Sequence, residues 1–220
     1  MRVRILLLLL CISFATMISA QRMWKIGLPH GTQFIRINPT GLLDFVETNF
    51  SLGYEYHLTH NWSIAADATW IFYSKYFSHT KHANGFIFRP AIRRYTGPLK
   101  TGFLEAELHY KYVVSTIQDW LGRNCVGGVS AYEEFTKFDY LRKVIGFHLK
   151  VGHAAKLSKD NKFWFEYYIG LGARWTFRKV INEPNSCYIY ASGPFSDAIE
   201  NARTTIALPC GFRLLYNLRK

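Results

Sequence analysis

The sequence lacks any long apolar run after its first twenty residues. A membrane-spanning helix needs about eighteen consecutive apolar residues, and no later stretch is that long. Charged residues make up only 19% of the 220 residues, whereas aromatic residues reach 17%. An aromatic content this high excludes a disordered or low-complexity chain. The composition therefore predicts a folded protein without spanning helices.

Sequence motifs for common ligands are also missing. The chain has no glycine-rich phosphate loop, no dinucleotide fingerprint, and no RNA-binding motif or long Lys/Arg cluster. The balance is basic, with 27 Lys and Arg against 15 Asp and Glu, but without such motifs nucleic acid is not expected as a partner. His79 and His82 lie three residues apart with no further ligand nearby, so neither a metal nor a cofactor is predicted.

The N-terminus has the layout of a secretory signal peptide over residues 1–20. Arg2 and Arg4 precede the apolar run Ile5–Ile12, and the small residues Ser19-Ala20 follow it. The sequence thus predicts export with removal of residues 1–20. Residues 21–31 are expected to form an N-terminal periplasmic segment, and residues 32–220 a single domain.

Most of this domain alternates between apolar and polar residues, which is typical of β-strands. In NFSLGYEYHL, from Asn49 to Leu58, every second residue is apolar and the residues between are Ser51, Gly53, Glu55 and His57. The same period occurs in the segments 62–72, 85–94, 102–116, 144–157, 162–177 and 204–218. With the segment QFIRIN before Pro39, this predicts eight strands, the number in the smallest outer-membrane barrels.

The predicted connections alternate in length. Short links are expected at 59–61, 97–101 and 158–161, and long ones at 73–84, 115–139 and 179–203. Outer-membrane barrels have short periplasmic turns and long extracellular loops. The fold predicted is therefore all-β: an eight-stranded antiparallel up-and-down transmembrane β-barrel.

Charged residues gather on one face of the predicted strands. In a transmembrane barrel the apolar face meets lipid, and these charges pair inside a lumen that eight strands leave just wide enough to fill. We therefore expect no open pore. The predicted lumen network is Glu55, Asp67, Arg89, Arg93, Glu105, Glu107, Lys111, Lys150, Glu166, Arg174 and Arg213.

Three stretches of the chain resemble a protein family. They are RINPTGLL (36–43) followed by FSLGYEYHLTHNWSI, FEYYIGLGARWTFRK (165–179), and the closing GFRLLY. They are similar to small outer-membrane β-barrel proteins of Bacteroidetes, a domain of unknown function. The resemblance covers nearly the whole mature chain and implies an OmpA-like eight-stranded barrel, with no catalytic residues to carry over. Residues 217–220 extend past the terminal aromatic that usually ends such chains.

Two sets of side chains suggest further chemistry. Cys125 and Cys187 fall in the two longest predicted loops and are the expected disulfide, whereas Cys210 should face lipid.

The excess bases should form an outer rim, where they either bind the phosphates of lipopolysaccharide or are ordinary snorkelling cations. This rim is Lys75, Lys81, Arg142, Lys143, Arg178, Lys179 and Arg203.

The function predicted is a structural or surface-interaction role in the outer membrane. Outer-membrane lipid and lipopolysaccharide are the expected partners, together with another envelope protein that a small closed barrel would serve. One alternative is a barrel-embedded lipid-modifying hydrolase that uses Glu107, His109 and His148 with Ser63 or Ser115. The other is a soluble periplasmic β-barrel that binds an apolar ligand.

Overall fold

A computed structural model of the chain describes residues 30–44, 46–77, 79–97, 101–126, 129–188 and 203–219. The predicted signal peptide and almost all of segment 21–31 lie outside the described residues. The described residues are all-β apart from one 3-10 turn, η1 (Pro39–Leu43). None of their helices has the length and apolar character to cross a bilayer.

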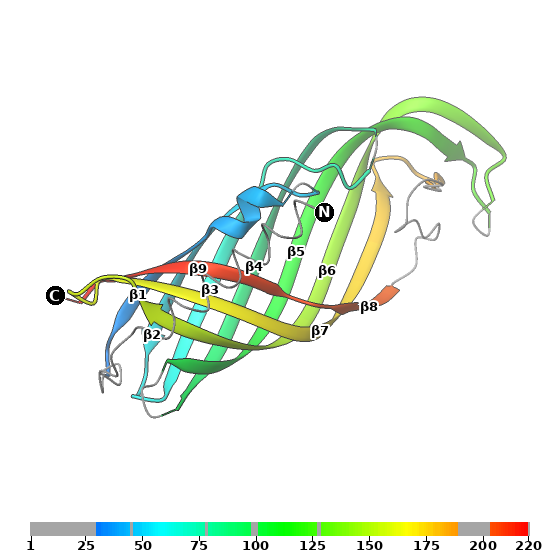
Figure 1. Ribbon diagram of the computed structural model, residues 1–220. Coiled ribbons are helices and arrows are strands. Elements are labelled where there is room, and N and C mark those ends of the chain that lie inside the picture. Colours follow the sequence, from blue (N-terminus) through cyan, green and yellow to red (C-terminus); the bar gives the residue numbers. More distant parts are fainter. Residues whose placement is uncertain are drawn as a thin grey trace, which may run out of the picture.

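The strands form one antiparallel sheet that closes on itself (Figure 1). Its strands are β1 (Gln33–Asn38), β2 (Asn49–His57), β3 (Trp62–Ile71), β4 (Thr80–Thr96), β5 (Gly102–Arg123), β6 (Tyr132–Lys156), β7 (Phe163–Ile181), β8 (Arg203–Ala207) and β9 (Cys210–Asn217). Strands β1 to β7 pair in sequence order, and β9 pairs with both β7 and β1, which completes the ring.

Strands β8 and β9 occupy one position in this ring. Strand β7 pairs with both in a single register, because Gly172 lies opposite Ala207 and Ile169 lies opposite Cys210. The two residues between them, Leu208 and Pro209, interrupt the ladder, and a proline has no backbone N–H to donate to it. The ring thus has eight strand positions, the number that the alternation predicts.

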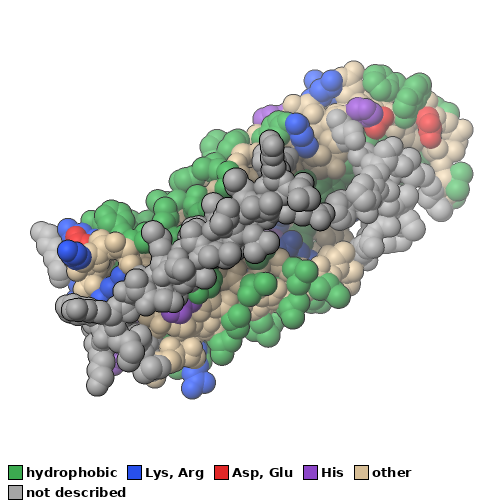
Figure 2. All heavy atoms as spheres, in the orientation of Figure 1, with side chains coloured by type: hydrophobic (Ala, Val, Ile, Leu, Met, Phe, Trp, Pro, Cys, Tyr) green, Lys and Arg blue, Asp and Glu red, His purple; other side chains and the backbone are tan. Residues whose placement is uncertain are grey.

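The outer surface of the ring is apolar, and the inside is polar. Large side chains such as Leu108, Leu149, Ile169 and Leu171 are 57–62% exposed, and groups of hydrophobic side chains lie along the length of the ring on the side shown in Figure 2. The polar residues between them in each strand, for example Glu55 at 0%, are buried inside. This distribution is the reverse of that in a water-soluble domain.

The prediction of a long loop at residues 115–139 is wrong. Strands β5 and β6 continue as a paired hairpin to Arg123 and from Tyr132, and they extend beyond the rest of the ring (Figure 1). The hairpin is held by Ile117, Leu121 and Phe138, which pack in one buried cluster with aromatic residues of other segments. Apolar residues at these positions stabilise the strand pairing, so the described residues outside the two strands here are only 124–126 and 129–131.

A disulfide joins the segment that follows β5 to the segment that follows β7. Cys125, just after β5, is bonded to Cys187, which follows β7, with the two Cα atoms 6.0 Å apart. This is the predicted disulfide. Cys210, expected to face lipid, has a free and exposed thiol at the start of β9.

Candidate functional site: the charged interior and its cavity

An aromatic layer fills the interior at the end that carries the short turns. It contains Phe34, Tyr95, Phe103, Trp164 and Tyr168, all of them at most 7% exposed. Sequence reasoning missed this layer, although the strand period contains the signal. Trp164 and Tyr168 lie on the same face of β7 as Glu166, two residues to either side.

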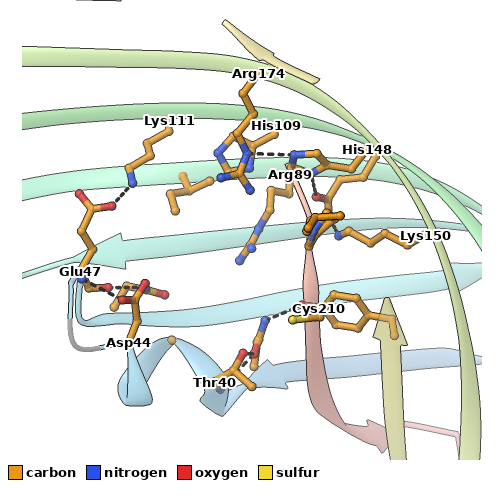
Figure 3. Close-up of a pocket in the computed structure, with 18 residues that line it drawn as sticks. Thr40, Asp44, Glu47, Arg89, His109, Lys111, His148, Lys150, Arg174 and Cys210 are labelled. Atoms are coloured by element: carbon orange, nitrogen blue, oxygen red, sulfur yellow. Dashed lines mark hydrogen bonds and ion pairs between the residues drawn. The ribbon is translucent and has the colours of Figure 1, made fainter. Parts of the chain in front are cut away.

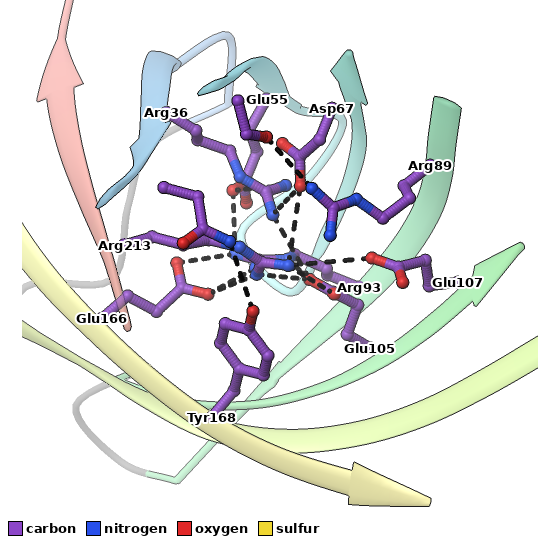
Figure 4. A network of polar contacts seen from close by, with 12 residues as sticks. Arg36, Glu55, Asp67, Arg89, Arg93, Glu105, Glu107, Glu166, Tyr168 and Arg213 are labelled. Carbon is purple, nitrogen blue, oxygen red and sulfur yellow. Dashed lines mark hydrogen bonds and ion pairs between the residues drawn. The ribbon is translucent and has the colours of Figure 1, made fainter. Parts of the chain in front are cut away.

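A central ionic cluster lies next to this layer, and Figure 4 shows how its members converge from different strands. Its members are Arg36, Glu55, Asp67, Arg93, Glu105, Glu166 and Arg213. Arg93 is fully buried and contacts three carboxylates: Glu105, Glu55 at 2.9 Å and Glu166 at 3.0 Å. Arg213 in turn bridges Glu105 and Glu166, with distances of 3.1 and 3.0 Å.

The cluster satisfies the condition under which buried charges are tolerated. Removing ions from water is costly, and only close opposite charges with good hydrogen-bond geometry compensate the cost. Each carboxylate here contacts at least one guanidinium group, and Arg93 and Arg213 each contact several carboxylates. The centre of the ring, in the part of the chain that the structure describes, is therefore occupied by paired charges.

The structure brings most of the predicted lumen network together, but in separate groups. Glu107 and Lys150 adjoin the central ionic cluster, since Lys150 contacts both Glu105 and Glu107. Lys111 instead pairs with Glu47, a residue of the segment after η1 that sequence reasoning missed. The cationic side chains in the interior outnumber the carboxylates, because Arg36 and Arg142 also point inward.

Two members of the predicted basic rim lie inside the ring, which corrects that prediction. Arg142 is 6% exposed, contacts Glu47 and lies 3.8 Å from the centre of the Tyr76 ring. Arg178 is half-buried and donates to the Tyr76 hydroxyl at 2.7 Å. Their sequence neighbours Lys143 and Lys179 are exposed, because adjacent residues of a strand point to opposite faces.

The rest of the predicted rim behaves differently. Lys75 and Lys81 are exposed, as the prediction requires. The side chain of Arg203 lies outside the described residues. The exposed rim of the described residues thus consists of lysines, whereas the two arginines whose side chains are described face the interior.

A cavity of about 420 Å³ lies between the central ionic cluster and the segment that contains η1 and Glu47 (Figure 3). Four strands of the wall supply its cationic and imidazole groups. These are Arg89 from β4, His109 and Lys111 from β5, His148 and Lys150 from β6, and Arg174 from β7.

Glycines make room for the long side chains of this cavity. Gly146 pairs with both His109 and Arg174, and a Cβ there would lie 3.0 Å from Cγ of Arg174. At Gly172 a Cβ would lie 2.4 Å from Cδ2 of His148. Side chains from neighbouring strands therefore cross these positions, and a larger residue would displace them.

One imidazole of the cavity is fixed by hydrogen bonds on both sides. The Nε atom of Arg174 donates to Nε2 of His148 at 3.1 Å, and Nδ1 of His148 lies 3.0 Å from Oε1 of Glu107. Because Nε2 accepts, Nδ1 carries the proton and donates it to the carboxylate. His148 thus links Arg174 to Glu107 as a neutral ring.

The cavity fits neither of two common chemistries. Glu107, His109 and His148 place three donor atoms within 4.8 Å of one another, but the nearby Arg174 and Lys150 would repel a divalent cation. Neither serine of the predicted hydrolase alternative lies beside the imidazoles of this cavity. Ser63 donates to Glu55 at 2.6 Å, and Ser115 is six residues along β5 from His109, about 20 Å at the usual strand rise.

Asp119 of β5, on the extended hairpin, contacts residues of two other segments, Tyr188 and His79. Burial opposes ionisation of Asp119, but hydrogen bonds with Tyr188 and His79 hold its pKa below the usual value.

Comparison of the chain with protein-family models, with curated proteins and with solved structures found no match.

Proposed function

We propose that this chain is an exported outer-membrane β-barrel that spans the bilayer without an open pore and has a structural or surface-interaction role. The observation that carries the proposal is the belt of large apolar side chains on the outside of a ring with a charged interior. In water such a belt would be an extensive exposed apolar surface, far beyond what soluble monomers carry. In a bilayer it would face lipid.

The ends of the ring also support a membrane position. The short connections 58–61 and 157–162 lie at one end, whereas the longer connections lie at the other. Exposed aromatic residues occur at both ends of the belt, with Trp62 and Phe163 beside short connections and Trp70 near the opposite end. Such girdles are typical of membrane barrels. The signal-like pattern of residues 1–20 supports export.

The extended hairpin supports a surface-interaction role. Trp120, Tyr132 and Phe135 are 53–58% exposed on the part of β5 and β6 that projects beyond the ring. The Cys125–Cys187 disulfide fixes the base of its turn. Exposed aromatic residues on a rigid projection provide contact area at low cost in conformational entropy.

The direct test is the behaviour of the protein in the membrane fraction. We expect the chain to remain in membranes that have been washed with urea, and to migrate differently on gels before and after boiling, because a closed barrel resists detergent until it is heated. Boiled protein is the control for the unfolded position. Release into the soluble fraction without any shift would contradict the proposal and favour a soluble periplasmic protein.

The filled interior predicts that the barrel does not conduct ions. Arg93 and Arg213, together with their carboxylate partners, occupy the centre of the ring, so no continuous aqueous path is expected. Planar bilayers with the refolded protein should show no more current than bilayers with protein-free detergent. Stable unit conductance steps in the wild-type protein would contradict a closed interior.

A further inference from the structure

The wall of the ring is incomplete beside the cavity. Strand β1 ends at Asn38. The position next to it in the ring, which β9 and β8 occupy in turn, continues beyond that end of β1. Among the described residues β8 has a partner strand only in β7, so no strand joins it to the β2 side. We call this interval, bordered by η1 on one side and residues 203–210 on the other, the wall gap.

The cavity reaches the wall gap. Leu208, Pro209 and Cys210 line the cavity. The first two form the interruption between β8 and β9, and Cys210 is the first residue of β9. Thr40 of η1 adjoins the same strand, because a Cβ at Gly211 would lie 3.2 Å from its hydroxyl oxygen. The cavity is therefore bounded on this side by a broken strand and a short turn, not by a paired wall.

Two arginines of the cavity have no carboxylate partner among the described residues. Arg89 donates only to neutral hydroxyls, those of Ser51 at 3.0 Å and Thr69 at 2.7 Å. Arg174 donates to the neutral His148 ring. The other cations that line the cavity are paired, Lys111 with Glu47 and Lys150 with Glu107. Two guanidinium groups of the cavity thus have no described carboxylate within ion-pair distance.

Buried nitrogen atoms without a partner also lie at this cavity. The Nδ1 atom of His109 has no hydrogen-bond partner in the described structure, although this side chain is only 5% exposed. The Nε atom of Arg89 is likewise buried without a partner. Figure 3 shows Arg174 reaching toward His148, with His109 and Arg89 beside it. Buried polar atoms rarely stay unpaired unless something binds them.

We propose that this cavity binds a phosphate group. A phosphate offers several acceptor oxygens and a negative charge, which matches two guanidinium forks and an imidazole N–H. A cavity of about 420 Å³ exceeds the volume of the phosphate itself and leaves room for part of the group esterified to it. The chemistry is shared by inorganic phosphate, soluble phosphate esters and the head groups of anionic lipids.

The wall gap favours a lipid as the source. If the apolar belt lies in the bilayer, which is the function proposed above, the gap opens toward lipid, and a head group can enter sideways while its chains remain outside. A soluble phosphate would instead enter from the aqueous end. The lipid source rests on the proposed function, whereas the phosphate site itself does not.

The test measures binding to the refolded protein by calorimetry. The probes are inorganic phosphate, glycerol phosphate, and micelles of a neutral detergent with and without phosphatidic acid. We expect saturable binding of at least one phosphate probe. Arg89→Gln and Arg174→Gln should each weaken it about tenfold or more, as expected for loss of a charge-assisted hydrogen bond. Arg94→Gln, which removes an exposed guanidinium of β4 outside the cavity, should have no effect.

The outcomes separate the two proposals. Binding of phosphatidic acid alone would identify a lipid source, and comparable binding of inorganic phosphate would identify a soluble one; both support the site. Protein that shows the gel shift of the folded barrel but binds no probe would overturn the site and leave the proposed function intact. Unchanged binding by both arginine variants would also overturn it. Because each arginine contacts only neutral groups, both variants are expected to fold, and the gel shift checks this.

Discussion

Replacement of Arg93 with alanine is expected to destabilise the folded ring by about 3–5 kcal/mol or more, since removal of one partner leaves buried charges uncompensated. Arg93 is fully buried and contacts Glu55, Glu105 and Glu166. The Arg93→Ala protein should unfold at a lower urea concentration in lipid vesicles than the wild type. On unboiled gels, much of it should migrate at the position of the unfolded chain.

The adjacent residue provides a matched control. Arg94 is an exposed arginine on the opposite side of the same strand, and its guanidinium group lies 5.7 Å from the centre of the Trp62 ring. Arg94→Ala should therefore change the unfolding midpoint little. Equal stability of the two variants would mean that the central ionic cluster does not hold the ring together.

Replacement of Leu149 with arginine is expected to lower the stability of the membrane-inserted protein by about 2–4 kcal/mol, the cost of an arginine on the lipid face of a barrel near the bilayer centre. Leu149 is 57% exposed, and its neighbours across the two adjacent strands are Ala106 and Leu171. The measurement is the urea midpoint of the protein in vesicles. In a water-soluble protein the same change at so exposed a position would have little effect.

Phe135 is the control position for this substitution. It also points outward and is 53% exposed, but it lies on the projecting part of the hairpin, opposite Trp120. Phe135→Arg should cost much less than Leu149→Arg, because this part of the hairpin would lie beyond the bilayer. Similar small effects at both positions would contradict a lipid-facing belt.

Strand alternation in the sequence is sufficient to predict most of the fold. It places Leu149 on the outside and Lys150 on the inside, because the outward-facing and inward-facing residues alternate along a strand. The number of alternating segments also gives the eight strand positions. The same rule would have placed Arg142 inside and Lys143 outside. The prediction failed there because it treated this pair as one basic rim and did not apply the alternation to each residue.

Other features depend on contacts that are remote in the sequence. Glu47 belongs to no strand, and its partners Lys111 and Arg142 lie on β5 and β6. No local pattern reports such a pairing. The length of the β5–β6 hairpin is a similar case, because its aromatic cluster includes Phe77 and Tyr188 from separate connections. The wall gap also depends on where β1 ends relative to β8, which alternation does not determine.

The position of the belt in the bilayer is the central claim, and quenching of tryptophan fluorescence by brominated lipids tests it most directly. Two variants would each retain one tryptophan in vesicles of brominated phosphatidylcholine: Trp70, which is 59% exposed on the outside, or Trp164, which is 3% exposed inside the ring. We predict strong quenching of Trp70, greatest for bromine near the head groups, and little quenching of Trp164. Equal, negligible quenching of both residues in folded protein would contradict the transmembrane barrel.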